Sequence, residues 1–157
     1  MAVSGSVVSI VVDCSVLGKW ELPVEDHTPE AMEIFRDWQA GAVVVHSPDL
    51  LLTEIGSVFL RSVRRGRITE PEARVSIRNL LRLNYVLHDS GPLVLDAFEI
   101  AHQYNQRIYD CFYVALAERE RMSFWTSDLR MYNALSAHFP SVCHIANYVA
   151  HRPPPSP

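Results

Sequence analysis

The sequence has few of the features that mark membrane, secreted and disulfide-rich proteins. No apolar run approaches the length that crosses a bilayer, and the first residues do not combine a basic stretch with the long apolar segment of a secretory signal. Cysteine is rare: Cys14, Cys111 and Cys143 are an odd number without a CxxC pair, and each lies in an apolar stretch. We therefore expect buried thiols rather than disulfides or zinc ligands, and a soluble protein of the cytoplasm with no membrane partner.

Common catalytic and cofactor motifs are also missing. There is no GxSxG, P-loop or GxGxxG sequence, which removes the usual motifs for acyl transfer and for binding nucleotide phosphates. The seven histidines include no HExxH or other metal-ligand spacing. The formal net charge of −4 argues against a generally cationic surface. Any contact with a nucleic acid must therefore be local.

The chain is long and apolar enough to form one domain with a proper core. It has 157 residues, of which 48% are hydrophobic and 20% are charged, and it contains neither an internal repeat nor a linker. We expect a single domain over residues 1–151. The proline-rich end, residues 152–157, predicts a disordered tail.

Short apolar runs alternate with segments of helical periodicity. Residues 7–12 are nearly all apolar or β-branched, which suits a strand buried on both faces. We expect the first full helix to begin at Thr28 as its N-cap, with Pro29 at the first helical position and Gly41 at its end.

Two consecutive helices are expected next. Ser47-Pro48 opens a helical segment that ends at Gly66, and Thr69 and Glu72 form a capping box before the second helix, so the two form a hairpin. The remaining expected elements are strands at residues 42–46, 85–88, 124–126 and 142–145 and helices at residues 92–104, 109–122 and 128–138.

This alternation of strands and helices predicts an α/β domain of three layers. Its centre would be a mainly parallel sheet of four or five strands, flanked by helices through right-handed crossovers. In such sheets, ligands bind beyond the carboxyl ends of the strands. Asp13 and Asp128 each follow an expected strand directly, so both are expected at that edge.

Three acidic residues of the sequence each have an ordinary structural explanation when they are taken alone. Asp13 lies where Asp commonly caps a helix, Asp110 opens an expected helix, and Asp128 precedes another. Glu54 is different because Leu51 and Val58 place it beside the apolar stripe of its helix, with no Lys or Arg within one turn. A carboxylate buried there requires either a distant Arg or a cation as its partner.

Asp110 repeats the pattern of Glu54. Tyr113 and Val114 lie one helical turn after it and Ala117 lies two turns after it, in the most core-like helix of the chain. Two helices therefore direct an acid towards the protein interior, and two more acids are expected at the sheet edge. The economical interpretation is one pocket of oxygen ligands for a hard cation, Mg²⁺ or Mn²⁺.

Four stretches of the sequence resemble the PIN-domain family, and more closely its VapC branch, the ribonuclease toxins of type II toxin–antitoxin systems. Their order and spacing match the family over nearly the whole chain. They are Val11-Val12-Asp13-Cys14-Ser15-Val16-Leu17, Pro48-Asp49-Leu50-Leu51-Leu52-Thr53-Glu54-Ile55, Tyr109-Asp110-Cys111-Phe112-Tyr113-Val114-Ala115-Leu116-Ala117-Glu118 and Thr126-Ser127-Asp128. The sequence departs from the family in Cys111-Phe112 after the third acid and in the aromatic pair Phe124-Trp125, which affects pocket shape more than chemistry.

The resemblance implies the site residues and the activity. The catalytic and metal-binding acids would be Asp13, Glu54, Asp110 and Asp128, with the hydroxyls of Ser15 and Thr126 orienting a ligand or water. The implied protein is an Mg²⁺- or Mn²⁺-dependent endoribonuclease that hydrolyses RNA phosphodiester bonds to a 5′-phosphate and a 3′-hydroxyl. It would be a homodimer and a toxin neutralised by a small cognate antitoxin.

Two questions stay open at this level. Arg61, Arg64, Arg65 and Arg67 form a cationic cluster that suits RNA phosphates, with Arg61, Arg64 and Arg65 as the possible RNA contacts, although arginines at a helix end also favour the negative end of the helix dipole. The alternative to an enzyme is a catalytically silent PIN fold that binds RNA or a protein. A phosphatase with Asp13 as nucleophile is disfavoured because Ser15 stands where that chemistry usually has a second Asp.

Overall fold

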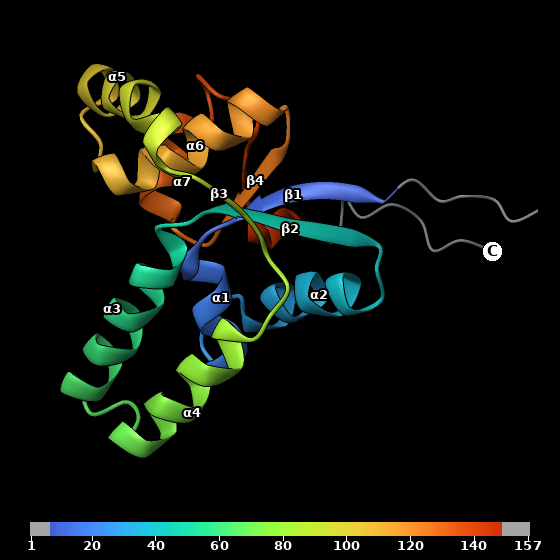
Figure 1. Ribbon diagram of the computed structural model, residues 1–157, viewed down its shortest axis with the longest axis vertical. Coiled ribbons are helices and arrows are strands. Elements are labelled where there is room, and N and C mark those ends of the chain that lie inside the picture. Colours follow the sequence, from blue (N-terminus) through green and yellow to red (C-terminus); the bar gives the residue numbers. More distant parts are fainter. Residues whose placement is uncertain (1–6, 149–157) are drawn as a thin grey trace, which may run out of the picture.

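Five parallel strands form the centre of the protein (Figure 1). The structure is a computed structural model, and it describes residues 7–148. The strands lie in the order β3-β2-β1-β4-β5, and all four neighbouring pairs are parallel. They are β1 (Val8–Val12), β2 (Val43–Pro48), β3 (Val86–His88), β4 (Ser123–Thr126) and β5 (Val142–His144). The predicted α/β fold with a parallel central sheet is confirmed.

Helices cover both faces of this sheet. They are α1 (Cys14–Glu21), α2 (Thr28–Gln39), α3 (Leu51–Arg64), α4 (Glu70–Leu81), α5 (Val94–Tyr104), α6 (Ile108–Glu120) and α7 (Leu129–Leu135), with 3₁₀ turns at Gly91–Leu93 and Ile145–Asn147. Right-handed crossovers place α1 to α4 on one face and α5 to α7 on the other, the lower and upper layers of Figure 1.

The strand order reverses at β1. From there the chain passes outwards to β2 and β3, then returns to β4 on the other side of β1 and continues to β5. The crossovers that leave β1 and β4 therefore lie on opposite faces, which opens a crevice beyond the carboxyl ends of these two strands. That edge, near the start of α3 at the left of the sheet in Figure 1, is where a ligand site is expected.

The central strands and α6 supply most of the core. Ile10, Val11 and Val12 of β1 are almost fully buried. Every residue from 111 to 117 of α6 is buried, because this helix is covered by α5 on one side and packs on β1, β2 and β4 on the other. A helix that is apolar on all sides needs such cover.

One helix, α1, was not predicted. It begins directly after β1, with Asp13 as N-cap: the Asp13 side chain accepts a hydrogen bond from the backbone N–H of Ser15. Its apolar residues continue the apolar run of the strand without a turn signal, and Gly18 weakens its local helix propensity. Packing against α2 and α3 stabilises it instead.

Two predicted helix starts were also wrong. Thr28 is the first residue of α2 rather than its N-cap, because its hydroxyl accepts a hydrogen bond from Glu25 N–H, and His27 takes the cap position with a left-handed backbone (φ 62°). Ser47 and Pro48 belong to β2, and α3 begins only at Leu51. The Ser47 hydroxyl donates to Val12 O of the neighbouring strand, which keeps this segment in the sheet.

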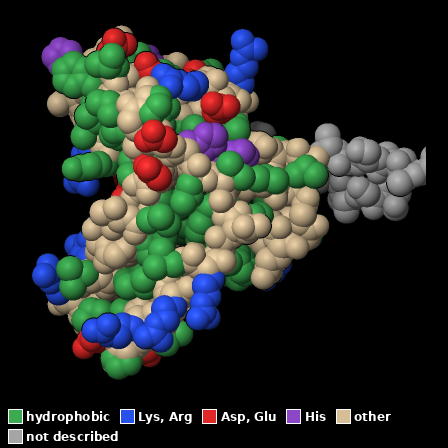
Figure 2. Space-filling view, in the orientation of Figure 1, with side chains coloured by type: hydrophobic (Ala, Val, Ile, Leu, Met, Phe, Trp, Pro, Cys, Tyr) green, Lys and Arg blue, Asp and Glu red, His purple; other side chains and the backbone are tan. Residues whose placement is uncertain are grey.

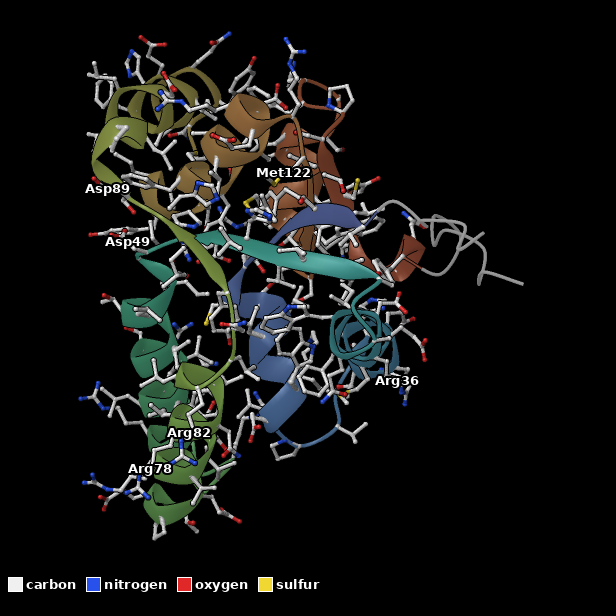
Figure 3. The ribbon with its side chains drawn as sticks, turned by 45° about the vertical axis from the view of Figure 1, so that its right-hand side comes forward. Arg36, Asp49, Arg78, Arg82, Asp89 and Met122 are labelled. Carbon is white, nitrogen blue, oxygen red and sulfur yellow. The ribbon has the colours of Figure 1, made fainter. Side chains whose placement is uncertain are left out.

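The predicted hairpin is formed by α3 and α4, which project away from the sheet (Figure 1). The predicted capping box is present: the Thr69 hydroxyl accepts from Glu72 N–H, and the Glu72 carboxylate accepts from Thr69 N–H at 2.7 Å. Arg78 and Arg82 lie at the α4 side of this hairpin in Figure 3.

Other expectations concern the cysteines and the chain ends. The three cysteines are free, with Cys14 and Cys111 buried and Cys143 partly buried. Among residues 7–148, no helix is long and apolar enough to cross a membrane. The domain limit expected at residue 151 and the tail expected at residues 152–157 lie outside the described residues.

Candidate active site

The four predicted acids come from four different elements and meet at the carboxyl edge of β1 and β4. Asp13 follows β1, Glu54 lies in the first turn of α3, Asp110 lies in the first turn of α6, and Asp128 is the N-cap of α7. Their charges interact: Asp13 is influenced by Asp110 and Asp128, and Glu54 by Asp13 and Asp110. The crevice at the strand-order reversal is therefore strongly acidic.

Asp13 is the most tightly held of the four. Its side chain is only 6% exposed, and both of its oxygens accept hydrogen bonds. The Ser15 N–H and hydroxyl donate to Oδ1 at 3.1 and 2.5 Å, and the Thr126 hydroxyl donates to Oδ2 at 2.6 Å. Burial raises the pKa of Asp13 to about 6, although these hydroxyl donors lower it, and the charges of Asp110 and Asp128 raise it further. The hydrogen bonds therefore fix the Asp13 carboxyl group in a position where burial and neighbouring charges disfavour its ionised form.

A small network of hydroxyls joins the end of β4 to Asp13. Ser127 N–H donates to Ser15 Oγ at 2.9 Å, and the Ser127 hydroxyl donates to Ser15 O at 3.0 Å. Asp128 N–H donates to Thr126 Oγ1 at 3.0 Å, and Asp128 Oδ1 accepts from Met131 N–H. Asp128 therefore caps α7 and also contributes negative charge to the site. The helix-cap explanation therefore applies to this residue, and its charge also raises the pKa of Asp13 and Asp110.

Glu54 has a buried oxygen that makes no regular hydrogen bond in the described part of the chain. Its Oε1 is buried and has no hydrogen-bond partner within the described chain, and the same holds for the Tyr113 hydroxyl. Burial raises the pKa of Glu54 to about 8, the charges of Asp13 and Asp110 raise it further, and the nearby Tyr113 hydroxyl lowers it. Since a buried carboxylate without a partner is costly, this oxygen is an available ligand position.

Asp110 lies between the acids and two cations. Its Oδ2 is buried and makes no hydrogen bond to residues 7–148. Arg130 Nη2 lies 3.8 Å from this oxygen, which is an ion-pair contact but too long for a hydrogen bond. Burial and the charge of Asp128 raise the pKa of Asp110, whereas Arg107 and Arg130 lower it.

These donors suit a hard divalent cation. Carboxylate oxygens are the ligands that Mg²⁺ and Mn²⁺ prefer, and Glu54 Oε1 and Asp110 Oδ2 are available. Within residues 7–148, no group of three or more His, Cys, Asp and Glu side chains is arranged tightly enough to enclose a metal ion. Carboxylates spaced more widely than that can still contact Mg²⁺ through the water ligands that this ion usually keeps.

Comparison with known proteins agrees with this geometry. The family model described as "PIN domain" matches residues 10–134. This chain belongs to the PIN-domain family. The predicted resemblance is thereby confirmed, and the matched segment includes all four acids.

Relatives of this PIN domain include curated proteins and solved structures. It is 30% identical over 112 residues to Ribonuclease VapC3 of Pyrobaculum aerophilum, covering 70% of this chain and 82% of that protein. The crystal structure of PAE2754 from the same organism is similar with a TM-score of 0.65 at 18% identity, over 92% of this chain and 88% of the other. A toxin–antitoxin complex from Klebsiella pneumoniae gives a TM-score of 0.53 at 14% identity, over 87% and 97%.

The PIN domain contains site neighbours that the sequence did not reveal. Ser127 connects Ser15 to the β4 end, and Arg107 and Arg130 influence Asp110. Their positions offered a weak signal, since Arg107 precedes Asp110 by three residues and Arg130 follows Asp128 by two. Arg107 is the N-cap of the helix that carries Asp110, whereas Arg130 reaches Asp110 from the first turn of α7, a contact between separate elements.

The predicted arginine cluster divides into two groups. Arg61 and Arg65 line a cavity of about 200 Å³ between α1 and α3, whereas Arg64 is not part of its lining. Ser15 and Ser127 line the same cavity, so it adjoins the hydroxyl network of Asp13. The PIN domain therefore places part of its cationic cluster next to the acids.

Proposed function

We propose that this PIN domain is a divalent-metal-dependent endoribonuclease that hydrolyses RNA phosphodiester bonds and acts as the toxin of a toxin–antitoxin pair. The observation that carries the proposal is the convergence of Asp13, Glu54, Asp110 and Asp128 at one sheet edge, where two buried carboxylate oxygens accept no hydrogen bond in the described chain. The name of the relative Ribonuclease VapC3 supports the reaction class.

The acids would divide the work of holding Mg²⁺ or Mn²⁺. Asp13 is the fixed ligand, because Ser15 and Thr126 hold both of its oxygens in place. Glu54 and Asp110 supply ligands through their unpartnered oxygens, either directly or through water. Asp128, already fixed by its capping bond to Met131 N–H, is suited to orient an attacking water or to hold a second ion. When bound, the cation would polarise the phosphodiester and lower the pKa of a bound water.

Repulsion between the carboxylates is a second reason to propose a bound cation. With no cation present, several carboxylates share a poorly solvated crevice and the pKa values of Asp13, Glu54 and Asp110 are all raised. Protonated acids neither hold a metal nor orient water. A divalent ion favours their ionised forms and converts a repulsive cluster into a binding site.

The test is a cleavage assay on total RNA with Mg²⁺ or Mn²⁺. We compare wild type with Asp13→Asn and Asp110→Asn, and use Asp96→Asn as the control, because Asp96 is an exposed carboxylate on α5 that pairs with Arg119. Metal-dependent cleavage by wild type and the control, with loss in both site variants, supports the proposal. Equal cleavage in EDTA, or full cleavage by both site variants, contradicts it. RNA binding without any cleavage would instead favour a silent binding module.

Exposed apolar side chains support the proposed protein partners. The α3–α4 hairpin exposes Leu52, Leu60, Val75 and Leu81, and α5 exposes Val94, Leu95 and Phe98. Figure 2 shows hydrophobic side chains over much of the face that carries these helices. We assign these surfaces to a homodimer contact and to a small antitoxin, because extended apolar patches mark protein interfaces. A cellular RNA substrate would place the complex in the cytoplasm.

Sedimentation equilibrium tests the proposed dimer. Leu95→Glu introduces a charge at the most exposed of the α5 apolar positions (73% exposed), so folding should be unaffected. A dimeric wild type and a monomeric variant support the assignment to α5. A monomeric wild type contradicts the proposed dimer.

A further inference from the structure

A cationic cavity adjoins the acids and has no role in the metal chemistry proposed above. It lies between α1 and α3 and has a volume of about 200 Å³. Its lining includes Lys19, Arg61, Arg65 and Arg67, with Glu25 as the one carboxylate of the lining. The cavity thus carries a strong positive charge in a chain whose formal net charge is −4.

The wall of this cavity is built from a buried lysine and a shared carboxylate. Lys19 is only 9% exposed, and its Nζ donates to Glu25 Oε1 at 2.8 Å. Arg67 Nη2 donates to the other oxygen, Glu25 Oε2, at 2.5 Å. Glu25 therefore joins two cations, and the hydrogen bonds to both lower the pKa of its carboxyl group even though partial burial opposes this. These hydrogen bonds hold Lys19, Glu25 and Arg67 in place, and the three side chains together still carry a net positive charge.

The other two cations are available for a ligand. Arg61 lies in the last turn of α3 and Arg65 is the C-cap residue of that helix, and both are exposed. Within residues 7–148, no ion pair includes either of them. Guanidinium groups recognise phosphate oxygens through paired hydrogen bonds, so two arginines facing one small cavity are well suited to a phosphate.

The cavity is joined to the acidic site by shared residues. Ser15 lines the cavity, and its hydroxyl donates to Asp13 Oδ1. Ser127 also lines the cavity and stands between Thr126 and Asp128. A chain molecule that places one charged group among the acids can therefore place another charged group, further along its backbone, in the cavity.

We propose that the α1–α3 cavity binds a backbone phosphate of the RNA strand that flanks the phosphodiester bond to be cleaved. This inference rests on the proposed ribonuclease function and adds a substrate-positioning site to it. Among the described residues, the lining of the cavity carries four cationic side chains and includes no aromatic ring on which a base could stack, so it suits a phosphate group rather than a base. Arg107 and Arg130 lie on the opposite, α6–α7 side of the acids. The strand would thus cross the sheet edge between two cationic positions.

The first experiment measures RNA binding without cleavage. A short fluorescein-labelled single-stranded RNA is titrated with protein in EDTA at several salt concentrations. The test variant is the double change Arg61→Gln/Arg65→Gln, and the control is Arg64→Gln, an exposed arginine of the same helix that does not line the cavity. We expect about tenfold weaker binding or more for the double variant. Its salt dependence should also decrease, with a slope smaller by about 0.7 for each phosphate that the variant no longer neutralises.

A second measurement locates the phosphate. A set of RNAs, each with a single neutral methylphosphonate linkage at a different position, is bound to wild type and to the double variant. Wild type should be weakened by a neutral linkage at one position beside the cleaved bond, and the double variant should be insensitive at that same position. This coupling would not arise if the arginines only supported the fold.

The outcomes separate this inference from the proposed function. Equal RNA binding by wild type and the double variant, or an equal loss in Arg64→Gln, overturns the phosphate site even if the protein cleaves RNA. Selective loss of binding in the double variant supports the site even if no cleavage is found. Absence of RNA binding by wild type overturns it directly.

Discussion

Thr126 Oγ1 donates a 2.6 Å hydrogen bond to Asp13 Oδ2, although 113 positions separate these residues in the sequence. The bond joins the ends of β1 and β4, the two strands between which the strand order reverses. Thr126 Oγ1 also accepts from Asp128 N–H, so one buried hydroxyl positions two of the acids. The hydroxyl is therefore a structural part of the proposed metal site.

Thr126→Val should test this role, because valine keeps the shape and removes the hydroxyl. Asp13 Oδ2 would then be a buried acceptor without its donor, which costs about 1–3 kcal/mol of unfolding free energy when Asp13 is ionised. The loss should be larger at about pH 8 than at about pH 5, since a protonated Asp13 depends less on this donor. Urea unfolding in EDTA at both pH values measures it. Thr126→Ser retains the hydroxyl and loses only a buried methyl group, so it should cost about 1 kcal/mol at both pH values. A loss that depends on pH equally in both variants would contradict the role.

The metal-free protein should lose stability as the pH rises. The folded-state pKa of Glu54 is raised from 4.5 to about 8, so between these values the folded protein binds more protons than the unfolded chain. Stability is then highest below the ordinary pKa of the group and decreases until the pH passes the folded value, by at most about 1.4 kcal/mol per pH unit for one group. Asp13 adds a smaller decrease up to about pH 6.

Urea unfolding in EDTA between about pH 4 and pH 8 measures how the free energy of unfolding changes with pH. In Glu54→Gln, the decrease of this free energy towards pH 8 should be smaller than in wild type. The neutral amide cannot ionise, so the variant should be more stable than wild type at about pH 8 and similar to it at about pH 4. A wild-type stability that is constant or rises over this window would show that these carboxylates are better solvated than the structure indicates.

Mg²⁺ or Mn²⁺ should reverse this pH dependence. A cation that binds only the folded protein raises its stability by mass action, and it must displace protons from Asp13 and Glu54 to do so. The increase in Tm on adding the ion should therefore be larger at about pH 8 than at about pH 5. Thermal unfolding with Mg²⁺, with Mn²⁺ and with EDTA measures it. Asp13→Asn should abolish the increase; the same increase in wild type and Asp13→Asn would place the ion elsewhere.

Much of the fold could be predicted because its signals are local. The continuous apolar run of β1 and the capping box at Thr69 depend on neighbouring residues alone, and both are present. The helix α1 was missed because its eight residues continue the apolar run of β1 and are stabilised by α2 and α3, which lie later in the chain. Thr28 was misassigned for a similar reason: its hydroxyl binds Glu25 N–H in the preceding loop.

The acids that the structure brings together could be predicted, whereas their surroundings could not. Glu54 and Asp110 could be identified because each is a carboxylate on the apolar side of a helix, a pattern visible within one or two turns. The contact of Arg130 with Asp110 depends on how α6 packs beside α7. The division of the arginines into Arg61 and Arg65 at the cavity and Arg64 outside it depends on where α1 lies, and α1 was not predicted.

Thr69→Ala should lower the stability of the protein without changing its rate of RNA cleavage. It removes the capping box at the start of α4, on the hairpin that projects from the sheet, and leaves the acids and the α1–α3 cavity intact. Loss of an N-cap costs about 0.5–2 kcal/mol of unfolding free energy, and urea unfolding should detect that decrease. The rate of RNA cleavage per folded molecule should stay as in wild type, because no residue of the proposed site contacts the cap. A large fall in cleavage by this variant, measured well below its unfolding midpoint, would mean that α4 also contributes to the ribonuclease site.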